Sequence, residues 1–527
     1  MKNLYMDRLY PKAFENRPKL SDPKVRKSRV AFFRAAGKNF TLLQLLFLGL
    51  FCWVFAALFQ QVDHAHNITI ALVDYDGGAV GLALREAYSR LEGNTFPTLV
   101  ERDPVAYSSP SALEDSVCRT EYWAALYVTS GSSEKLQAVL NGSSDGSQFD
   151  RSDVITYIWN EARYSLVIDA VVSSSIQALA SAARVAYTTA NGTGGVQQLS
   201  TPEAISVFAQ PWQVTSINIQ PTTQGSRAIY NTLVIILILI QEFFYLGILN
   251  GLYVGHKLYS RLSPHLIATV RDIISILYCL VGSLCTTGAI WAFRSGWDVD
   301  GRQFMLSWMT LWLFAHVNFL QFDIFTVWLP APYVPMALIS WIIFNITSIL
   351  LPFELSPGFF RIGYAAPSHN VYQVLVDIWS RGCNPKLHYA LPILFVWWIW
   401  GLALSALGVY RRCHYAVIQE QREGRLFQER LDAAMQFEQQ RDMEAEGEDD
   451  RSRATSSIRP VAAGAFEEKK TSDAAEAASV RGQLAGVIHR EDSRARREQG
   501  REGRGCSFGP AFSLPFPQPA GSESDES

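Results

Sequence analysis

Residues 345–382, NITSILLPFELSPGFFRIGYAAPSHNVYQVLVDIWSRG, contain both the end of an apolar run and a short helical segment. The apolar run ends at Pro352 and Glu354, where a turn rich in Pro and Gly follows. The next segment begins at Ser368 and ends at Gly382. Ser is a favoured N-cap residue and Gly a favoured C′ residue. The stretch therefore predicts a membrane span, a turn and a short capped helix.

The short helix carries one polar stripe, because Gln373, Asp377 and Ser380 recur at i, i+4 and i+7. Apolar side chains cover the rest of its surface: Val371, Tyr372, Leu375, Val376 and Trp379. This pattern predicts a helix that lies in a membrane interface or on packed spans. A connecting loop with a surface helix is the alternative interpretation.

Outside this stretch, the apolar residues of the 527-residue chain gather in long runs. A helix needs about 20 apolar residues to cross a bilayer. Runs of this kind predict six spans, at residues 41–61, 229–254, 267–293, 304–328, 334–351 and 390–410. The last five form a membrane domain over residues 228–410, which includes an external loop with the short interfacial helix at 352–389.

The charges around these runs predict the orientation of the chain. Residues 1–40 form a basic arm with eleven Lys/Arg and three acidic residues, although the whole chain has a net charge of −3. The loop at 256–265 and the pair Arg411 and Arg412 are also basic, and basic loops stay in the cytoplasm. We therefore expect a multi-pass protein with both termini in the cytoplasm, inserted through the secretory pathway. The long basic lead argues against a cleaved signal peptide.

Residues 62–227 read as a soluble domain outside the membrane. Strand-like pieces such as ITIALVDY and YWAALYVTS alternate with helix-like pieces, which predicts a small α/β domain with a partly parallel sheet. Asn67, Asn141 and Asn191 begin glycosylation sequons within it. The predicted fold class is an α-helical polytopic membrane protein with a small extracytoplasmic α/β domain between the first two spans.

Two of the seven cysteines, Cys118 and Cys383, fall outside the membrane in this topology. They could pair in an oxidising compartment, and two free or buried thiols are the equal alternative. Beyond the sixth span we expect a cytosolic helical segment at 411–446. Residues 447–527 are rich in Glu, Arg, Ala, Ser and Gly, which predicts a disordered cytosolic tail.

Ionisable residues inside the spans are the main candidates for chemistry. Glu242 shares a helical face with Asn231 in the second span, and His316 shares one with Asp323 in the fourth. Because such groups are costly in hydrocarbon, they predict a polar pathway or proton site. Structural hydrogen bonds between spans are the alternative. Gly247, Gly251 and Gly255 recur at i, i+4 and i+8 and predict close helix packing.

The sequence has no P-loop, no metal-ligand spacing and no nucleophile motif, so it predicts no enzyme activity, cofactor or metal site. A lipid-modifying site at His369 and Asp377 has weak support, since helix polarity explains both residues. We expect no nucleic-acid binding, because the basic arm precedes a membrane span.

A resemblance supports a function. ELSPGFFRIGYAAPSHNVYQV, preceded by NITSILLPF, resembles the signature of fungal nitrosoguanidine-resistance membrane proteins, and QPWQVTSINIQPTTQGSRAIYN adds to the likeness. The resemblance covers about residues 30–410. That family shares a six-span plan with bacterial phage-infection/YhgE-type proteins and, more distantly, with permease subunits of ABC-2 exporters.

The resemblance implies resistance to nitrosoguanidine-type toxicants, by drug efflux or by an altered distribution of plasma-membrane lipids. It implies membrane lipids as partners. It leaves the energy source open: the protein recruits a separate ATPase, uses protons or acts without an energy source. The alternative is a non-transporting scaffold or regulator, whose external domain binds a partner or ligand and whose tail binds a cytosolic protein. A homodimer is compatible with either function.

Overall fold

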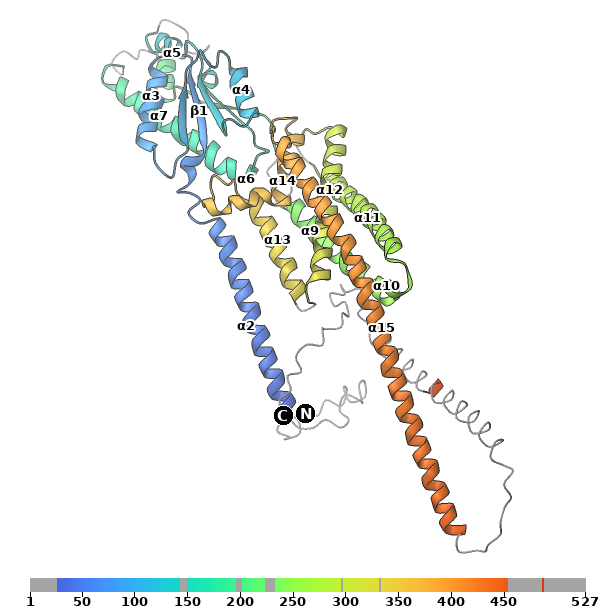
Figure 1. Cartoon of the computed structure of the whole chain (residues 1–527). Helices are drawn as coiled ribbons and strands as arrows, with labels where there is room; N and C mark the ends of the chain where they lie inside the picture. Colours follow the sequence, from blue (N-terminus) through green and yellow to red (C-terminus); the bar gives the residue numbers. More distant parts are fainter. Residues whose placement is uncertain are drawn as a thin grey trace, which may run out of the picture. The chain divides into compact units, whose positions relative to one another are not determined.

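A computed structural model describes residues 26–142, 149–195, 201–222, 233–294, 297–330, 333–453 and 486–487. The chain forms two compact units (Figure 1). We call the first the sheet unit; it combines residues 1–221 with residues 339–369. We call the second the helix unit; it combines residues 222–338 with residues 370–527.

The sheet unit contains a five-stranded sheet with the strand order β2-β1-β3-β4-β5. Its strands are β1 (Thr69–Asp74), β2 (Thr98–Arg102), β3 (Ala124–Val128), β4 (Ile155–Trp159) and β5 (Val214–Asn218). β1 pairs in parallel with β2 and β3, and β4 in parallel with β5, while β3 and β4 are antiparallel. The sheet is therefore mixed, with its antiparallel pair in the middle.

Helices cover this sheet (Figure 1). They are α3 (Ala79–Leu91), α4 (Pro110–Cys118), α5 (Ser132–Leu140), α6 (Ser165–Ile168), α7 (Ser174–Gly195) and α8 (Pro202–Ala209). α4 packs on the sheet through Leu113 and Val117, which join a buried cluster with Ala71, Val73 and Ile158. The side chain of Ser109 caps α4 by accepting a hydrogen bond from the backbone N–H of Ala112.

The sheet unit also includes long apolar helices. α2 (Arg26–Ala57) packs against α13 (Val334–Leu350), most of which belongs to this unit. The indole of Trp53 donates a 2.9 Å hydrogen bond to the hydroxyl of Thr347, and its ring contacts that of Phe344. Because α2 begins at Arg26, part of the expected basic arm is helical and continuous with the first apolar run.

The helix unit is built around one central helix. Its helices are α9 (Val234–Gly255), α10 (Leu258–Arg261), α11 (Pro264–Ala292), α12 (Gly301–Trp328), α14 (Pro367–Trp379) and α15 (Leu387–Arg453). α12 packs against α9, α11 and α15, and most of its second half is buried. The side chain of Asp300 caps α12 in a capping box with Gln303.

Length and composition identify five helices among the described residues that could cross a membrane. They are Val30–Ala57, Ser165–Asn191, Val234–Gly255, Pro264–Ala292 and Leu387–Gln436, with Val334–Leu350 as a shorter apolar helix. The chain is thus a mostly helical membrane protein. Four of the six expected spans are in this set, whereas α12 is not. Because α12 is surrounded by other helices, its polar residues do not need to face lipid.

Ser165–Asn191 meets the same criterion although it lies in the sheet unit. Its apolar side chains Ile176, Leu179 and Ala183 are buried, and it packs against α3. By length and composition alone, an apolar helix of this kind fits either a membrane span or the core of a soluble domain. Here its buried face packs within the α/β core of the sheet unit.

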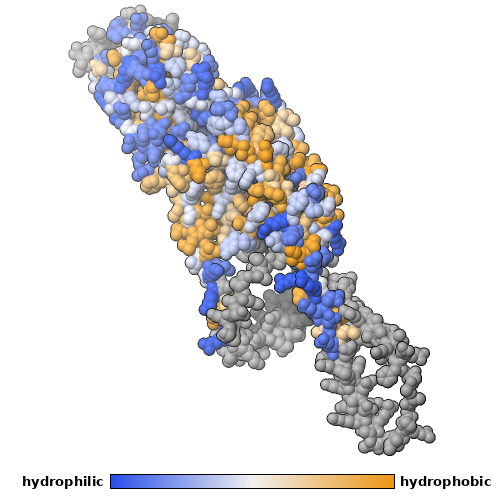
Figure 2. All heavy atoms as spheres, in the orientation of Figure 1, coloured by the Kyte–Doolittle hydropathy of each residue, from blue (hydrophilic) through white to orange (hydrophobic). Residues whose placement is uncertain are grey.

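The long helices expose apolar side chains. On α2 they include Phe40, Leu45, Leu48, Phe51 and Phe55, and on α11 they include Val270, Ile273, Leu277, Val281 and Leu284. Figure 2 shows large hydrophobic areas over the long helices and a mostly hydrophilic surface over the sheet and its helices. Such exposed apolar faces fit contact with lipid chains.

α14 departs from its expected caps. It begins at Pro367, one residue before Ser368, whose hydroxyl instead donates a 2.9 Å hydrogen bond to the side-chain oxygen of Asn345. At the other end Arg381 takes the left-handed conformation with a φ of 55°, and the Gly382 N–H bonds to the Asp377 carbonyl at 2.8 Å. This is a Schellman end with Arg381 at C′, where Gly382 was expected.

The polar stripe of α14 is buried. Gln373, Asp377 and Ser380 are at most 9% exposed. The side-chain amide of Asn384 donates to the side-chain oxygen of Gln373 at 3.0 Å, and its backbone N–H donates to Asp377 at 3.3 Å. The following loop thus contacts Gln373 and Asp377, while the Ser380 hydroxyl donates to the Val376 carbonyl. The sequence had predicted a helix in the interface or on packed spans, and the burial of the stripe agrees with a packed position.

α15 is longer than the sequence predicted. It continues from the sixth apolar run without a break through the expected segment 411–446 and ends at Arg453. The helix therefore includes the first seven residues of the tail expected to be disordered, 447–453. Most of the remaining tail lies outside the described residues.

Candidate functional site

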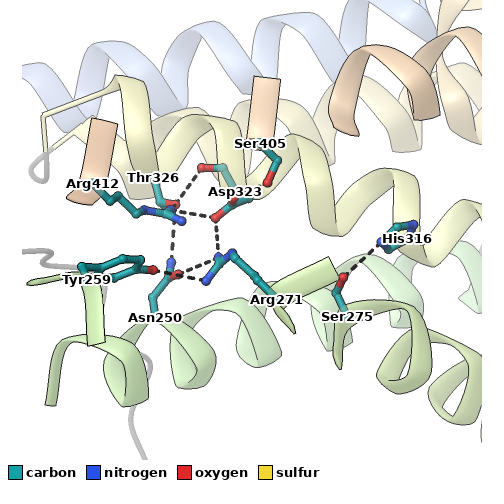
Figure 3. A network of polar contacts seen from close by, with 9 residues as sticks. All are labelled: Asn250, Tyr259, Arg271, Ser275, His316, Asp323, Thr326, Ser405 and Arg412. Atoms are coloured by element: carbon teal, nitrogen blue, oxygen red, sulfur yellow. Dashed lines mark hydrogen bonds and ion pairs between the residues drawn. The ribbon is translucent and has the colours of Figure 1, made fainter. Parts of the chain in front are cut away.

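A cluster of buried charged and polar side chains lies between the helices of the helix unit (Figure 3). Five elements contribute to it. The members are Asn250 from α9, Tyr259 from α10, Arg271 from α11, Asp323 and Thr326 from α12, and Ser405 and Arg412 from α15. We call this set the Asp323 cluster.

Asp323 is its centre, because two guanidinium groups donate to the same oxygen. Arg271 donates to Oδ1 at 2.5 Å and Arg412 donates to it at 2.7 Å. The hydroxyl of Ser405 donates to Oδ2 at 2.7 Å. Asp323 has no exposed surface, and each arginine side chain is 1% exposed. Both ion pairs are thus fully removed from water.

Neutral side chains satisfy some of the remaining donors. Arg271 donates to the Asn250 side-chain oxygen at 2.7 Å and to the Tyr259 hydroxyl at 3.4 Å. Arg412 donates to the Thr326 hydroxyl at 2.8 Å. Three buried donor nitrogens lack a hydrogen-bond partner among the described residues: Nε of Arg271, and Nε and Nη1 of Arg412. The cluster therefore has unused capacity for an anion.

His316 lies on α12 seven residues before Asp323, and it has separate partners (Figure 3). The indole N–H of Trp398 donates to Nδ1 at 2.8 Å, so this nitrogen acts as an acceptor. Nε2 lies 3.1 Å from the hydroxyl of Ser275, which itself donates to a backbone carbonyl. These bonds define a neutral imidazole with its proton on Nε2, which is the pattern of a structural hydrogen bond.

Glu242 is the third ionisable group and is also fully buried, on α9. The thiol of Cys279 donates to its Oε2 at 3.3 Å, which is a weak hydrogen bond. Its Oε1 has no hydrogen-bond partner among the described residues. A buried carboxyl group with one unused oxygen is costly when charged, and a proton site at Glu242 stays a prediction.

The structure thus distributes the expected polar site over three local sets. Glu242, His316 and Asp323 each have their own hydrogen-bond partners, while Asn231 lies outside the described residues. The sequence reading missed Arg271 and Arg412. Arg271 lies within the third apolar run, where a charge is itself a signal. Arg412 had been interpreted only as part of a basic pair that marks the cytoplasmic side.

The glycine stripe on α9 is not uniformly packed. Gly247 is buried, Gly251 is half-buried, and a Cβ at Gly255 would meet nothing within 4 Å. Close packing is therefore wrong for Gly255 and stays a prediction for the other two. A close approach occurs at Gly401 of α15, where a Cβ would lie 2.9 Å from Cβ of Leu320 on α12.

The expected modification sites are found on described residues. Asn67 and Asn141 are exposed, whereas Asn191 is half-buried and its amide donates to the Tyr187 carbonyl at 3.0 Å. The free thiols among the described residues are Cys52, Cys279, Cys285 and Cys413. Cys118 and Cys383 belong to different units, and their pairing stays a prediction.

Fold and site together define a class, a helical membrane protein with ionisable side chains buried between its helices. Residues 39–403 match the family described as protein of unknown function (DUF3533), and the chain belongs to that family. No solved structure matches the chain.

Proposed function

We propose that this protein is an ABC-2-permease-like membrane protein of the plasma membrane. It confers resistance to nitrosoguanidine-type toxicants, either by drug efflux or by changing the distribution of membrane lipids. The resemblance around residues 345–400 suggests this activity. The observation that carries a transport role is the buried carboxyl group of Glu242, which has an unused oxygen among helices with exposed apolar faces.

The proposal includes a topology with six spans and both termini in the cytosol. α2, α9, α11, α12, α13 and α15 supply the spans, and the five-stranded sheet with its helices lies outside. The polar α12 is compatible with this arrangement because other helices cover it. The basic residues before α2 and around α10 support the cytosolic side.

The test is transport by the purified full-length protein in liposomes. We expect flux of a labelled nitrosoguanidine or a labelled phospholipid, measured with and without a proton gradient. The Glu242→Gln variant keeps an acceptor for Cys279 but cannot carry a charge, so the gradient-dependent part of the flux should disappear. Glu203→Gln, at an exposed carboxyl group of α8, is the matched control and should transport normally.

Two results would count against the proposal in different ways. Full gradient-dependent flux in Glu242→Gln would remove the proton role and leave transport in place. No flux of any substrate, together with a stable co-purifying protein, would support the scaffold function instead.

A further inference from the structure

A pocket lies beside the Asp323 cluster, near the residues where the apolar part of α15 ends. α9, α10 and α15 line it, and its volume is about 190 Å³. A cavity needs about 10–15 Å³ of such volume to hold one water molecule, so the pocket has room for a polar group several times larger. The wall includes Arg412, Lys257, Tyr259, Ser260, Glu420 and Glu423.

The buried part of this pocket favours an oxyanion. Arg412 is 1% exposed and lines the wall, and its Nε and Nη1 have no hydrogen-bond partner among the described residues. It already shares the single carboxylate of Asp323 with Arg271, so that carboxylate does not offset both positive charges. Lys257 adds an ammonium donor to the same wall, whereas the Ser260 hydroxyl there already donates to the Lys257 carbonyl at 3.2 Å. A phosphate group supplies the acceptor oxygens that these donors need.

The outer part of the pocket has the opposite charge. Glu420 and Glu423 lie two to three turns beyond Arg412 on α15, and both side chains are exposed. Their carboxylates favour a cation that can donate hydrogen bonds. The pocket therefore runs from positive at its buried end to negative at its outer end.

We propose that this pocket binds a phosphate group linked to a primary ammonium group, as in an ethanolamine phospholipid head group. The phosphate contacts Arg412 and Lys257, and the ammonium contacts Glu420 and Glu423. Two alternatives fit less well. A quaternary ammonium has no N–H to donate to the two carboxylates, and a serine head group adds a carboxylate that they repel.

The orientation agrees with a lipid source. In a bilayer the phosphate lies nearer the hydrocarbon than the ammonium, and Arg412 lies nearer the apolar part of α15 than Glu420 and Glu423. The pocket also contains apolar surface from Val254 and Ala416. The inference relies on the proposed function only for the cytosolic position of this end, and it concerns binding, whether or not transport occurs.

The test is binding to the purified full-length protein in detergent, measured by isothermal calorimetry. The probes are dihexanoyl phosphatidylethanolamine, its choline and serine counterparts, and soluble phosphoethanolamine. We expect the ethanolamine lipid to bind at least about tenfold more tightly than the choline lipid. A tenfold difference in Kd corresponds to about 1.4 kcal/mol, which charge-assisted hydrogen bonds to the ammonium can supply. Competition by phosphoethanolamine would identify a free metabolite as the source, and its failure would identify the lipid.

The variants avoid the buried cluster. Glu420→Gln with Glu423→Gln should abolish the preference for ethanolamine over choline, and Lys257→Gln should weaken both lipids. Glu429→Gln, an exposed carboxyl group of α15 outside the pocket, should bind like the wild type. Equal binding of the two lipids by the wild type, or a preference unchanged in the double variant, would overturn the proposal. Lost flux with intact binding would instead count only against transport.

Discussion

At the scale of single residues, buried and exposed ion pairs should differ greatly in energetic importance. Asp323 pairs with Arg271 and Arg412 where none of the three side chains is more than 1% exposed. Asp298 pairs with Arg381 at 3.1 Å, with side chains 88% and 60% exposed. Removing one partner of a buried pair leaves an uncompensated charge, whereas an exposed pair is screened by water.

Asp323→Asn should therefore destabilise the protein by about 3–5 kcal/mol, because two buried guanidinium groups lose their carboxylate. Asp298→Asn is the matched control and should cost at most about 1 kcal/mol. Thermal unfolding in detergent, followed by size-exclusion fluorescence, would measure both. Equal stability of the two variants would show that Asp323 has little structural importance.

Asp377 should make stability depend on pH. Burial raises its pKa, and the hydrogen bond from the Asn384 N–H acts in the opposite direction. With a folded pKa above the unfolded value of about 3.9, the protonated group stabilises the fold at low pH. That stabilisation is lost as the pH rises through the folded pKa.

Asp377→Asn keeps an oxygen for the Asn384 N–H and has no charge. We expect it to unfold at a higher temperature than the wild type at pH 7, with the difference vanishing near pH 4. Thermal unfolding across this pH range is the measurement, and Asp115→Asn, at an exposed position of α4, should follow the wild type. A difference that stayed constant with pH would exclude titration of Asp377 as its cause.

At the scale of elements, the turn from β1 into α3 depends on a residue without a side chain. A Cβ at Gly81 would lie 1.8 Å from the carboxylate of Asp74, which is buried at the end of β1. That carboxylate accepts from the backbone N–H groups of Asp76 and Gly77 and pairs with Arg85 at 3.0 Å. A side chain at position 81 would therefore displace the group that organises the turn.

Gly81→Ala should destabilise the sheet unit by about 1–3 kcal/mol, the usual cost of overpacking. Gly93→Ala is the control, because a Cβ there would meet nothing within 4 Å. Limited proteolysis of the full-length protein would detect the difference as faster cleavage within residues 62–227. Equal protease resistance of the two variants would contradict the prediction, because it would show that the Asp74 side chain can move aside without loss of stability.

At the scale of the whole molecule, the proposed topology predicts which surfaces are modified. We expect glycosidase treatment to shift the protein through glycans at Asn67, Asn141 and Asn191. Asn67 and Asn141 should be modified more fully than Asn191, because both are exposed whereas Asn191 is half-buried within α7. Single Asn→Gln variants would assign each shift. Cleavage of residues 62–227 by protease added from the cytosolic side would contradict the topology.

The sequence by itself determined the features that depend on local pattern. Apolar runs located α2, α9, α11 and α13, and strand-like pieces located β1 and β3, because span length and side-chain pattern are local properties. It also indicated Glu242, His316 and Asp323, since an ionisable residue within an apolar run can be recognised from the sequence alone.

Only the tertiary structure decided which of these residues meet. Asp323 pairs with Arg271 and Arg412, which lie 52 and 89 positions away in the chain, so no local pattern links them. The same holds for the stripe on α14, where Asn384 of the following loop donates to Gln373 and Asp377. A hydrogen bond depends on distance in space, and the packing of helices sets that distance after the local elements have formed.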